Sequence, residues 1–319
     1  MTPSHDHAPG WQVWANLWIV YIVWGSTYLA IRYTVETLPP LLTAGFRFVV
    51  AGLVLYAFLA LRRGAASLRI SRREAGASTV VGAALLLGGN GGVMLAEQTV
   101  PSGLAALIIA SVPLWVVALR YVFEGGVDRA TLVGALAGFT GVGLLVAPGG
   151  AVGGADVVGL LLLVGASLSW ASGSFFSRYL PMPKDPFTST AHQMVFGGLV
   201  AALAGVLHGE LGRIDLNAAS AASLLGVGYL ITFGSLLAFT AYVWLLQHAP
   251  ISKVATYAYV NPVVAIFLGW VFLDEAITGR ILAGAALIIA AVAYVVTRSA
   301  EPVKPRQAGE SLPALAQTE

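Results

Sequence analysis

The sequence repeats itself at a nearly constant spacing, and this duplication limits the possible folds more than any other feature. Two sets of residues recur, one 146 and the other 149 positions further along the chain. A repeat of this length predicts two copies of one structural unit. The first set is Trp24, Ser26, Arg32, Tyr33, Pro40 and Gly52, which return as Trp170, Ser172, Arg178, Tyr179, Pro186 and Gly198; the second is Gln98, Pro101 and Pro113, which return as Gln247, Pro250 and Pro262.

The composition is that of a membrane protein. Of the 319 residues, 58% are hydrophobic and only 10% are charged, whereas soluble domains carry about 25% charged residues. We therefore expect an all-α integral membrane protein surrounded by the lipid bilayer. The chain has no cysteine, which excludes disulfides and thiolate metal sites. Beyond one short loop it has no basic tract, so we expect no nucleic-acid partner.

Ten apolar segments are long enough to span a bilayer, which takes about 20 helical residues. They divide into two units of five spans, 14–147 and 157–297. We expect a cytoplasmic tail over 1–13 and a disordered cytoplasmic tail over 298–319. The predicted spans are 14–33, 41–61, 77–98, 103–123, 131–147, 157–179, 188–207, 220–246, 252–272 and 280–297.

Arginine and lysine gather on one side of the predicted membrane. The loops and tail of that side carry 13 of them, and those of the other side carry three. Both chain ends are therefore expected to be cytoplasmic. Because each unit has an odd number of spans, the second unit is expected to be inverted relative to the first. Two inverted copies can exchange conformations, which is how many transporters open alternately to either side.

Several motifs follow one another along the chain, and most of them recur in the second half. They are Trp24-Gly25-Ser26 in span one, Ala44-Gly45-Phe46-Arg47-Phe48 in span two, the prolines in Ser111-Val112-Pro113 and Val260-Asn261-Pro262, and the acidic ends Phe123-Glu124 and Phe272-Leu273-Asp274-Glu275. With these motifs the chain resembles the EamA-domain branch of the drug/metabolite transporter superfamily, and most of all its bacterial amino acid exporters of the YddG type. The resemblance implies a basket of ten helices around a central cavity, in the bacterial inner membrane. It also implies that spans one, three, four, six, eight and nine line the cavity.

Aromatic and hydroxyl side chains are the first candidates for contact with a substrate. Trp24, Thr27 and Tyr28 share one face of span one, and Trp170 and Ser174 occupy the corresponding face of span six. An amphipathic solute needs aromatic walls and a few polar groups that orient it. The alternative is that small and hydroxyl-bearing residues let membrane helices pack closely.

Further candidates lie in spans three and nine. Asn90 stands among four glycines, which predicts either close helix packing or a hinge that lines the cavity, and Met94 follows one turn later. On span nine, Tyr257 and Asn261 share a face and are candidates for polar contacts with the substrate. Pro113 and Pro262 are expected to kink spans four and nine, or to free a backbone carbonyl for a substrate ammonium.

Arg47 is the only clearly intramembrane cation and needs a partner or water. Glu97, at the end of span three, is a candidate partner, and direct binding of a substrate carboxylate is the alternative. His192 and His248 could carry protons, although isolated histidines are more often structural. No acidic residue falls in the middle of a predicted span. Transport is therefore expected to be facilitated and uncoupled, with a proton-coupled carrier as the alternative.

The sequence favours a transporter over an intramembrane enzyme. It has no His-Glu-x-x-His motif and no Gly-x-Ser-x-Gly motif, and we expect no catalytic residues, metal site or cofactor. The expected function is export of small metabolites, chiefly amino acids with aromatic or other apolar side chains, by alternating access. Export or import of other neutral metabolites or drugs stays open. A monomer or weak homodimer is expected, because the Gly-x-x-x-Gly pair Gly134 and Gly138 serves either a dimer face or internal packing.

Overall fold

The computed structural model describes residues 9–147, 156–215 and 217–299. Over these ranges the regular structure is entirely helical. The first helix begins at Gly10, so part of the expected N-terminal tail belongs to it. Most of the expected C-terminal tail lies outside the described residues.

The first half contains the first five spans. Their elements are α1 (Gly10–Val35), α2 (Pro40–Arg63), η1 (Ala65–Leu68), α3 (Arg72–Gly82), η2 (Ala83–Gly91), α4 (Gly92–Ala96), α5 (Ser102–Ile109), α6 (Val112–Phe123) and α7 (Arg129–Val146). The second half repeats this order. Its elements are α8 (Val157–Phe176), η3 (Ser177–Tyr179), α9 (Pro186–Leu207), η4 (Glu210–Arg213), α10 (Ala221–Tyr229), η5 (Leu230–Leu237), α11 (Ala238–His248), α12 (Ile251–Val254), α13 (Tyr257–Leu273) and α14 (Gly279–Ser299).

The expected all-helical membrane architecture is confirmed. Within the described ranges, nine helices are long and apolar enough to cross a membrane, and α13 is a shorter apolar helix. Spans three and eight are each built from three consecutive helical pieces, with a π-helical piece in the middle. Spans four and nine are each divided into a short helix and a longer one, α5–α6 and α12–α13.

Successive spans alternate in direction, so the second half starts at the end of the bundle opposite to the first. One end, which we call the arginine-rich end, joins α2 to α9 through an ion pair of 2.9 Å between Arg63 and Asp185. There too, Lys253 lies 4.4 Å above the ring of Trp14 near the start of α1. At the opposite end, α8 begins beside the end of α4, where Gly159 lies against Val100. The two halves are therefore inverted copies.

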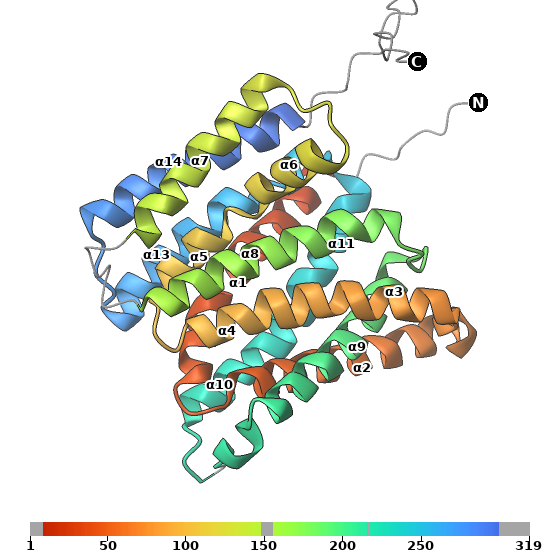
Figure 1. Ribbon diagram of the computed structural model, residues 1–319. Helices are drawn as coiled ribbons and strands as arrows, with labels where there is room; N and C mark the ends of the chain where they lie inside the picture. Colours follow the sequence, from red (N-terminus) through yellow and green to blue (C-terminus); the bar gives the residue numbers. More distant parts are fainter. Residues whose placement is uncertain (1–8, 148–155, 216, 300–319) are drawn as a thin grey trace, which may run out of the picture.

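The equivalent helices α2 and α9 pack against each other in antiparallel fashion (Figure 1). A Cβ atom added to Gly52 would lie 2.9 Å from the backbone nitrogen of Val195, and one added to Gly198 would lie 2.9 Å from that of Val49. These two contacts correspond under the repeat. The duplicated glycines therefore let the two backbones approach across a pseudo-twofold axis.

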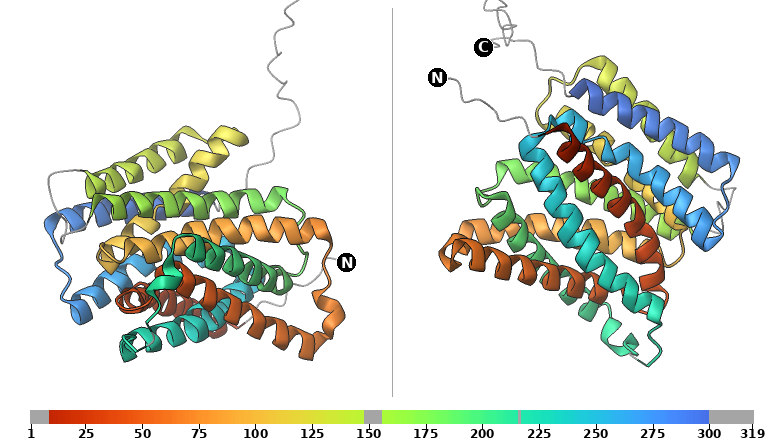
Figure 2. Two further views of the ribbon diagram at one scale, coloured as in Figure 1. Left: turned by 60° about the horizontal axis from the view of Figure 1, so that its bottom comes forward. Right: turned by 180° about the vertical axis from the view of Figure 1, so that it is seen from behind.

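The other equivalent pair, α7 and α14, forms an outer layer of the bundle (Figures 1 and 2). A Cβ atom at Gly134 would lie 2.6 Å from the ring of Tyr294, and one at Gly138 would lie 2.9 Å from Ala291. Both glycines of the Gly-x-x-x-Gly pair thus serve packing inside the chain.

The remaining helices interlock the two halves. In the first half, α1 packs against α10, α11 and α13 of the second, while α8 packs against η2, α4, α5 and α6 of the first. Each half therefore contributes its first span to a bundle made mostly by the other half. This reciprocal packing places the candidate site residues of span one beside span eight, and those of span six beside span three.

Candidate functional site

The two π-helical pieces, η2 and η5, lie at corresponding positions of the two halves. Residues 83–91 form η2 and residues 230–237 form η5. Adding the repeat spacing of 146 to the residue numbers of η2 gives nearly the same range as η5. A π-helix is uncommon, occurs mostly as a single turn, and is frequent at functional sites. Its recurrence in both copies marks this level of the bundle as the candidate site.

Trp24 on α1 lies against η5 and begins an aromatic cluster. Its indole nitrogen donates a hydrogen bond of 3.1 Å to the carbonyl of Gly234. Its ring centroid is 5.1 Å from that of Tyr242 and 5.2 Å from that of Tyr257. The two tyrosine rings are 5.7 Å apart at nearly right angles. Trp24, Tyr242 and Tyr257, which we call the aromatic cluster, join three helices of both halves.

Polar groups converge on η5 next to the aromatic cluster. Arg47 on α2 is 4% exposed, and its Nε donates a hydrogen bond of 2.9 Å to the hydroxyl of Ser235. A Cβ atom at Gly234 would lie 3.0 Å from the methyl group of Thr27 and 3.3 Å from a terminal nitrogen of Arg47. The absence of a side chain at this position lets Thr27, Arg47 and Trp24 meet.

The second half has a related arrangement around η2. Trp170 on α8 is half-buried against Gly89, where a Cβ atom would lie 2.7 Å from its ring. The neighbouring Ser169 donates a hydrogen bond of 2.8 Å to the carbonyl of Ala84. Each repeated tryptophan therefore contacts a glycine of the π-helical piece of the other half, Trp24 through a hydrogen bond to Gly234 and Trp170 through packing on Gly89. The match is imperfect, because in the second half no arginine corresponds to Arg47.

The other predicted substrate residues differ in exposure. Tyr28 and Asn90 are half-buried, and Ser174 is exposed. Met94 is fully buried in the large hydrophobic core that includes α5, α7 and α14. Asn261 is half-buried; with its side-chain nitrogen oriented to satisfy its neighbours, it donates to the carbonyls of Tyr21 and Tyr257 at 3.2 Å. Its amide thus holds α13 against α1.

The expected pairing of Arg47 with Glu97 is wrong. The hydrogen bond of Arg47 goes to Ser235, its guanidinium carbon lies 4.5 Å from the centre of the Phe48 ring, and its Nη1 has no hydrogen-bond partner among the described residues. Neither carboxylate oxygen of Glu97 has a partner there either. Arg32 instead donates to the backbone carbonyl of Glu97.

The prolines of spans four and nine do not act alike, which corrects the expectation of two similar kinks. Pro113 lies in the first turn of α6, whereas Pro262 lies inside α13. The breaks occur earlier in each span. Ser111 donates 2.6 Å to the carbonyl of Ile108 at one break, and Thr256 donates 2.6 Å to that of Lys253 at the other. Hydroxyls that bond to a carbonyl three residues earlier compete with the helical ladder.

A polar cluster joins the two halves at the arginine-rich end. Glu124, after α6, accepts a hydrogen bond from the hydroxyl of Tyr179 and forms ion pairs of 3.2 Å with Arg178 and 3.3 Å with Arg120. The Tyr179 hydrogen bond, with the charges of Arg178 and Arg120, lowers the pKa of Glu124 below its ordinary value. We call these four residues the Glu124 cluster.

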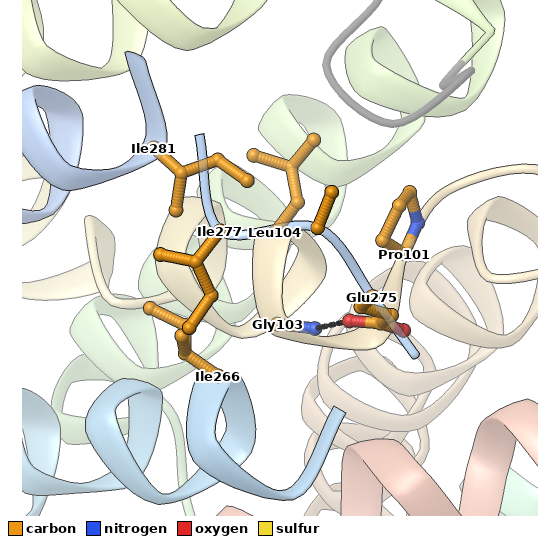
Figure 3. A pocket seen from close by; sticks show the side chains of 8 residues that line it. Pro101, Gly103, Leu104, Ile266, Glu275, Ile277 and Ile281 are labelled. Carbon is orange, nitrogen blue, oxygen red and sulfur yellow. Dashed lines mark hydrogen bonds between the residues drawn. The ribbon is translucent and has the colours of Figure 1, made fainter. Parts of the chain in front are cut away.

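The acidic pair after α13 joins the two halves at the opposite end in another way. Asp274 adopts a left-handed conformation, with φ 52°, and turns the chain back at the end of α13. Glu275 then accepts hydrogen bonds of 2.6 and 2.9 Å from the backbone nitrogens of Ser102 and Gly103 at the start of α5. Figure 3 shows this contact beside a pocket of about 10 Å³ lined mainly by apolar side chains. The first turn of α5 is a favourable place for a carboxylate.

The histidines lie away from the aromatic cluster. His192 is buried, its Nδ1 lies 2.8 Å from the carbonyl of Thr188 on its own helix, and its ring stands edge-on to Tyr56. His248 stacks on Trp244 at the exposed end of α11. Each therefore has a structural neighbour of its own.

Sequence reasoning missed the contribution of span eight. Gly234, Ser235 and Tyr242 are central to the candidate site, yet none was a candidate. The repeat carried the missing signal, because Gly88 and Gly89 return at a spacing of 146 as Gly234 and Ser235. The glycine-rich stretch of span three therefore pointed to its counterpart in span eight.

Comparisons with known proteins agree with this architecture. The protein named "Uncharacterized inner membrane transporter YedA" of Escherichia coli (strain K12) is 40% identical over 256 residues, 79% of this chain and 80% of its own. The "Probable amino-acid metabolite efflux pump" of Salmonella typhimurium is 26% identical over 287 residues, 85% of this chain and 90% of its own. A solved crystal structure superposes with a TM-score of 0.60 over 91% of this chain and 99% of that one, at 23% identity, and so shares the fold.

The family assignment covers nearly all of both halves. Residues 13–147 and 157–297 each match the EamA-like transporter family. The two matches coincide with the two inverted five-span units of the structure, so the repeat and the family domain are the same unit. The chain therefore belongs to the EamA-like transporter family.

Proposed function

We propose that this transporter exports amino acids with aromatic or other apolar side chains by alternating access. The observation that carries the proposal is the aromatic cluster, where Trp24, Tyr242 and Tyr257 stand beside the polar groups of η5, to which Arg47 is hydrogen-bonded as a positioning residue. Aromatic walls suit an apolar side chain, and convergent polar groups suit the charged ends of an amino acid. The printed name of the Salmonella typhimurium relative, an amino-acid metabolite efflux pump, supports the same substrate class.

The contacts between the halves at the two ends provide the parts for alternating access. The Glu124 cluster joins α6 to the end of α8 at the arginine-rich end. Glu275 joins the end of α13 to the start of α5 at the opposite end. Both contacts connect one half to the other, so rocking the halves would open one end while the other stays packed.

The arginine-rich end is proposed to face the cytoplasm, with the protein in the bacterial inner membrane. Because the chain has no cysteine, single cysteines introduced at each end report the orientation without background. An impermeant thiol reagent added to intact cells should label Arg213→Cys and spare Arg69→Cys. The reverse pattern would overturn the orientation.

A resistance screen tests the substrate class. The chain is expressed in a bacterium sensitive to toxic amino acid analogues, dipeptides and cationic dyes, with Trp24→Ala at matched expression as the control. We expect protection from analogues of aromatic and other apolar amino acids, and loss of that protection in the variant. Protection from cationic dyes alone would favour drug export instead.

Net transport is proposed to follow the substrate gradient without a coupling ion. The proposal is supported by the absence of acidic residues from the middle of the predicted spans, since proton coupling through a carboxylate needs an ionisable group at depth. Substrate efflux from proteoliposomes should therefore proceed at equal pH on both sides. Accumulation of substrate against its own gradient, driven by an imposed pH gradient, would favour the proton-coupled alternative.

A further inference from the structure

Glu97 is a buried acid that the proposed substrate path does not use. It follows α4 at the end of the bundle opposite the arginine-rich end, and it is fully buried. Both of its carboxyl oxygens are buried and have no hydrogen-bond partner among the described residues. A carboxylate without donors is expensive to bury, so this group needs a ligand of its own.

The groups around Glu97 come from α1 and from the end of α13. Arg32 of α1 directs a guanidinium nitrogen to the backbone carbonyl of Glu97. Glu275 is the second acid whose charge acts on Glu97, and Tyr28 of α1 lies close enough for the charge of Glu97 to act on its hydroxyl. Glu275 itself is satisfied by the backbone nitrogens of Ser102 and Gly103.

Three features of this arrangement disfavour a negative charge on Glu97. It is buried without a donor, it stands at the C-terminal end of a helix, where the dipole is negative, and a second carboxylate acts on it. Arg32 works in the opposite direction, but its hydrogen bond goes to the backbone. A proton on the carboxyl group removes all three costs.

We propose that Glu97 is a proton-binding site that must be filled before this end of the transporter can close. This inference rests on the proposed alternating access. When the contacts of Glu275 with α5 open, water reaches Glu97 and the proton exchanges with that side. The proton returns to the same side on the next opening, so it controls the rate and is not carried across.

The site exists at one end only. At the two repeat spacings, the positions that correspond to Glu97 in the second half are Val243 and Leu246. The Glu124 cluster, which closes the arginine-rich end, is exposed and made of charged pairs. Closure at the two ends should therefore differ in its response to pH.

The first test measures exchange of labelled phenylalanine in proteoliposomes at equal pH on both sides. For the natural chain, raising the pH from about 6 to about 8 should slow exchange about threefold or more, because fewer molecules can close. Glu97→Gln, whose neutral amide imitates the protonated acid, should exchange with less than about a twofold change over this range. Glu36→Gln, which removes an exposed carboxylate near the same end, should behave like the natural chain. An equal pH response in Glu97→Gln would overturn the proposal.

A second readout does not depend on transport. If the closed form holds a proton on Glu97, the thermal unfolding midpoint in detergent should fall as the pH rises above the ordinary glutamate pKa of about 4.3. In the Glu97→Gln variant the unfolding midpoint should fall less over this pH range, because the titrating carboxyl group is absent. In Glu36→Gln the midpoint should fall as much as in the natural chain. Equal slopes for all three would refute the proton site even if phenylalanine exchange works. Absence of exchange with any amino acid, beside the expected slopes, would refute the proposed function and leave the proton site standing.

Discussion

Individual residues show why only part of the site was predictable. Trp24, Thr27 and Tyr257 are predictable candidates because large aromatic and hydroxyl side chains inside a span are unusual, and the structure gathers them around η5. Ser235 and Gly234 carry no such signal, since small residues are ordinary in membrane helices. Their importance comes from what approaches them, which single residues in a sequence do not reveal.

Arg47 offers a test at the same scale. Because its visible contacts are with Ser235 and Phe48, Arg47→Gln should lower the maximal rate of phenylalanine transport several-fold and change KM by less than about twofold. Saturation kinetics at matched expression measures both.

Direct binding of the substrate carboxylate by Arg47 would give a different change in KM. If the free Nη1 of Arg47 binds the substrate carboxylate, Arg47→Gln should raise KM for phenylalanine about tenfold, the loss of about 1.4 kcal/mol. It should then leave KM for phenylethylamine, which has no carboxylate, unchanged. Such a split would contradict a purely positioning role.

At the scale of elements, hydropathy predicted the crossings but not their internal breaks. Ten apolar segments follow from the length needed to span lipid. The divided spans four and nine depend on Ser111 and Thr256, whose hydroxyls bond to carbonyls of their own helices. In span four the break lies one turn before Pro113, where a proline frees a backbone carbonyl, whereas in span nine it lies well before Pro262, which stays inside α13. The π-helical pieces were likewise hidden within continuous apolar stretches.

The Glu124 cluster makes an element-scale prediction about pH. Since its contacts lower the pKa of Glu124, they stabilise the closed arginine-rich end above the ordinary glutamate pKa, and this stabilisation is lost as the pH falls through the lower folded-state value. The unfolding midpoint of the natural chain should therefore exceed that of Glu124→Gln at neutral pH, and the difference should shrink below about pH 4.

The control for this prediction is Tyr179→Phe, which removes only the hydroxyl donor. It should reproduce part of the difference at neutral pH. A gap between the natural chain and Glu124→Gln that stays constant down to strongly acidic pH would contradict the role of the ionised carboxylate.

For the whole molecule, the duplication determines the architecture. Equivalent helices pair across a pseudo-twofold axis, α2 with α9 and α7 with α14, and each half completes a bundle with the first span of the other. An odd number of spans in each unit inverts the second unit relative to the first, so that equivalent helices can pair in antiparallel fashion. The departures from symmetry are Arg47, Glu97 and the different contacts of Glu124 and Glu275.

The most direct test of the account is counterflow in proteoliposomes. Vesicles are loaded with unlabelled phenylalanine, labelled phenylalanine is added outside, and entry is compared with that into unloaded vesicles. A carrier that exposes one site to each side in turn should accumulate label transiently above equilibrium in loaded vesicles, and Trp24→Ala should reduce this overshoot. Equal entry into loaded and unloaded vesicles, with no overshoot for any apolar amino acid, would contradict alternating access to a site between the two halves.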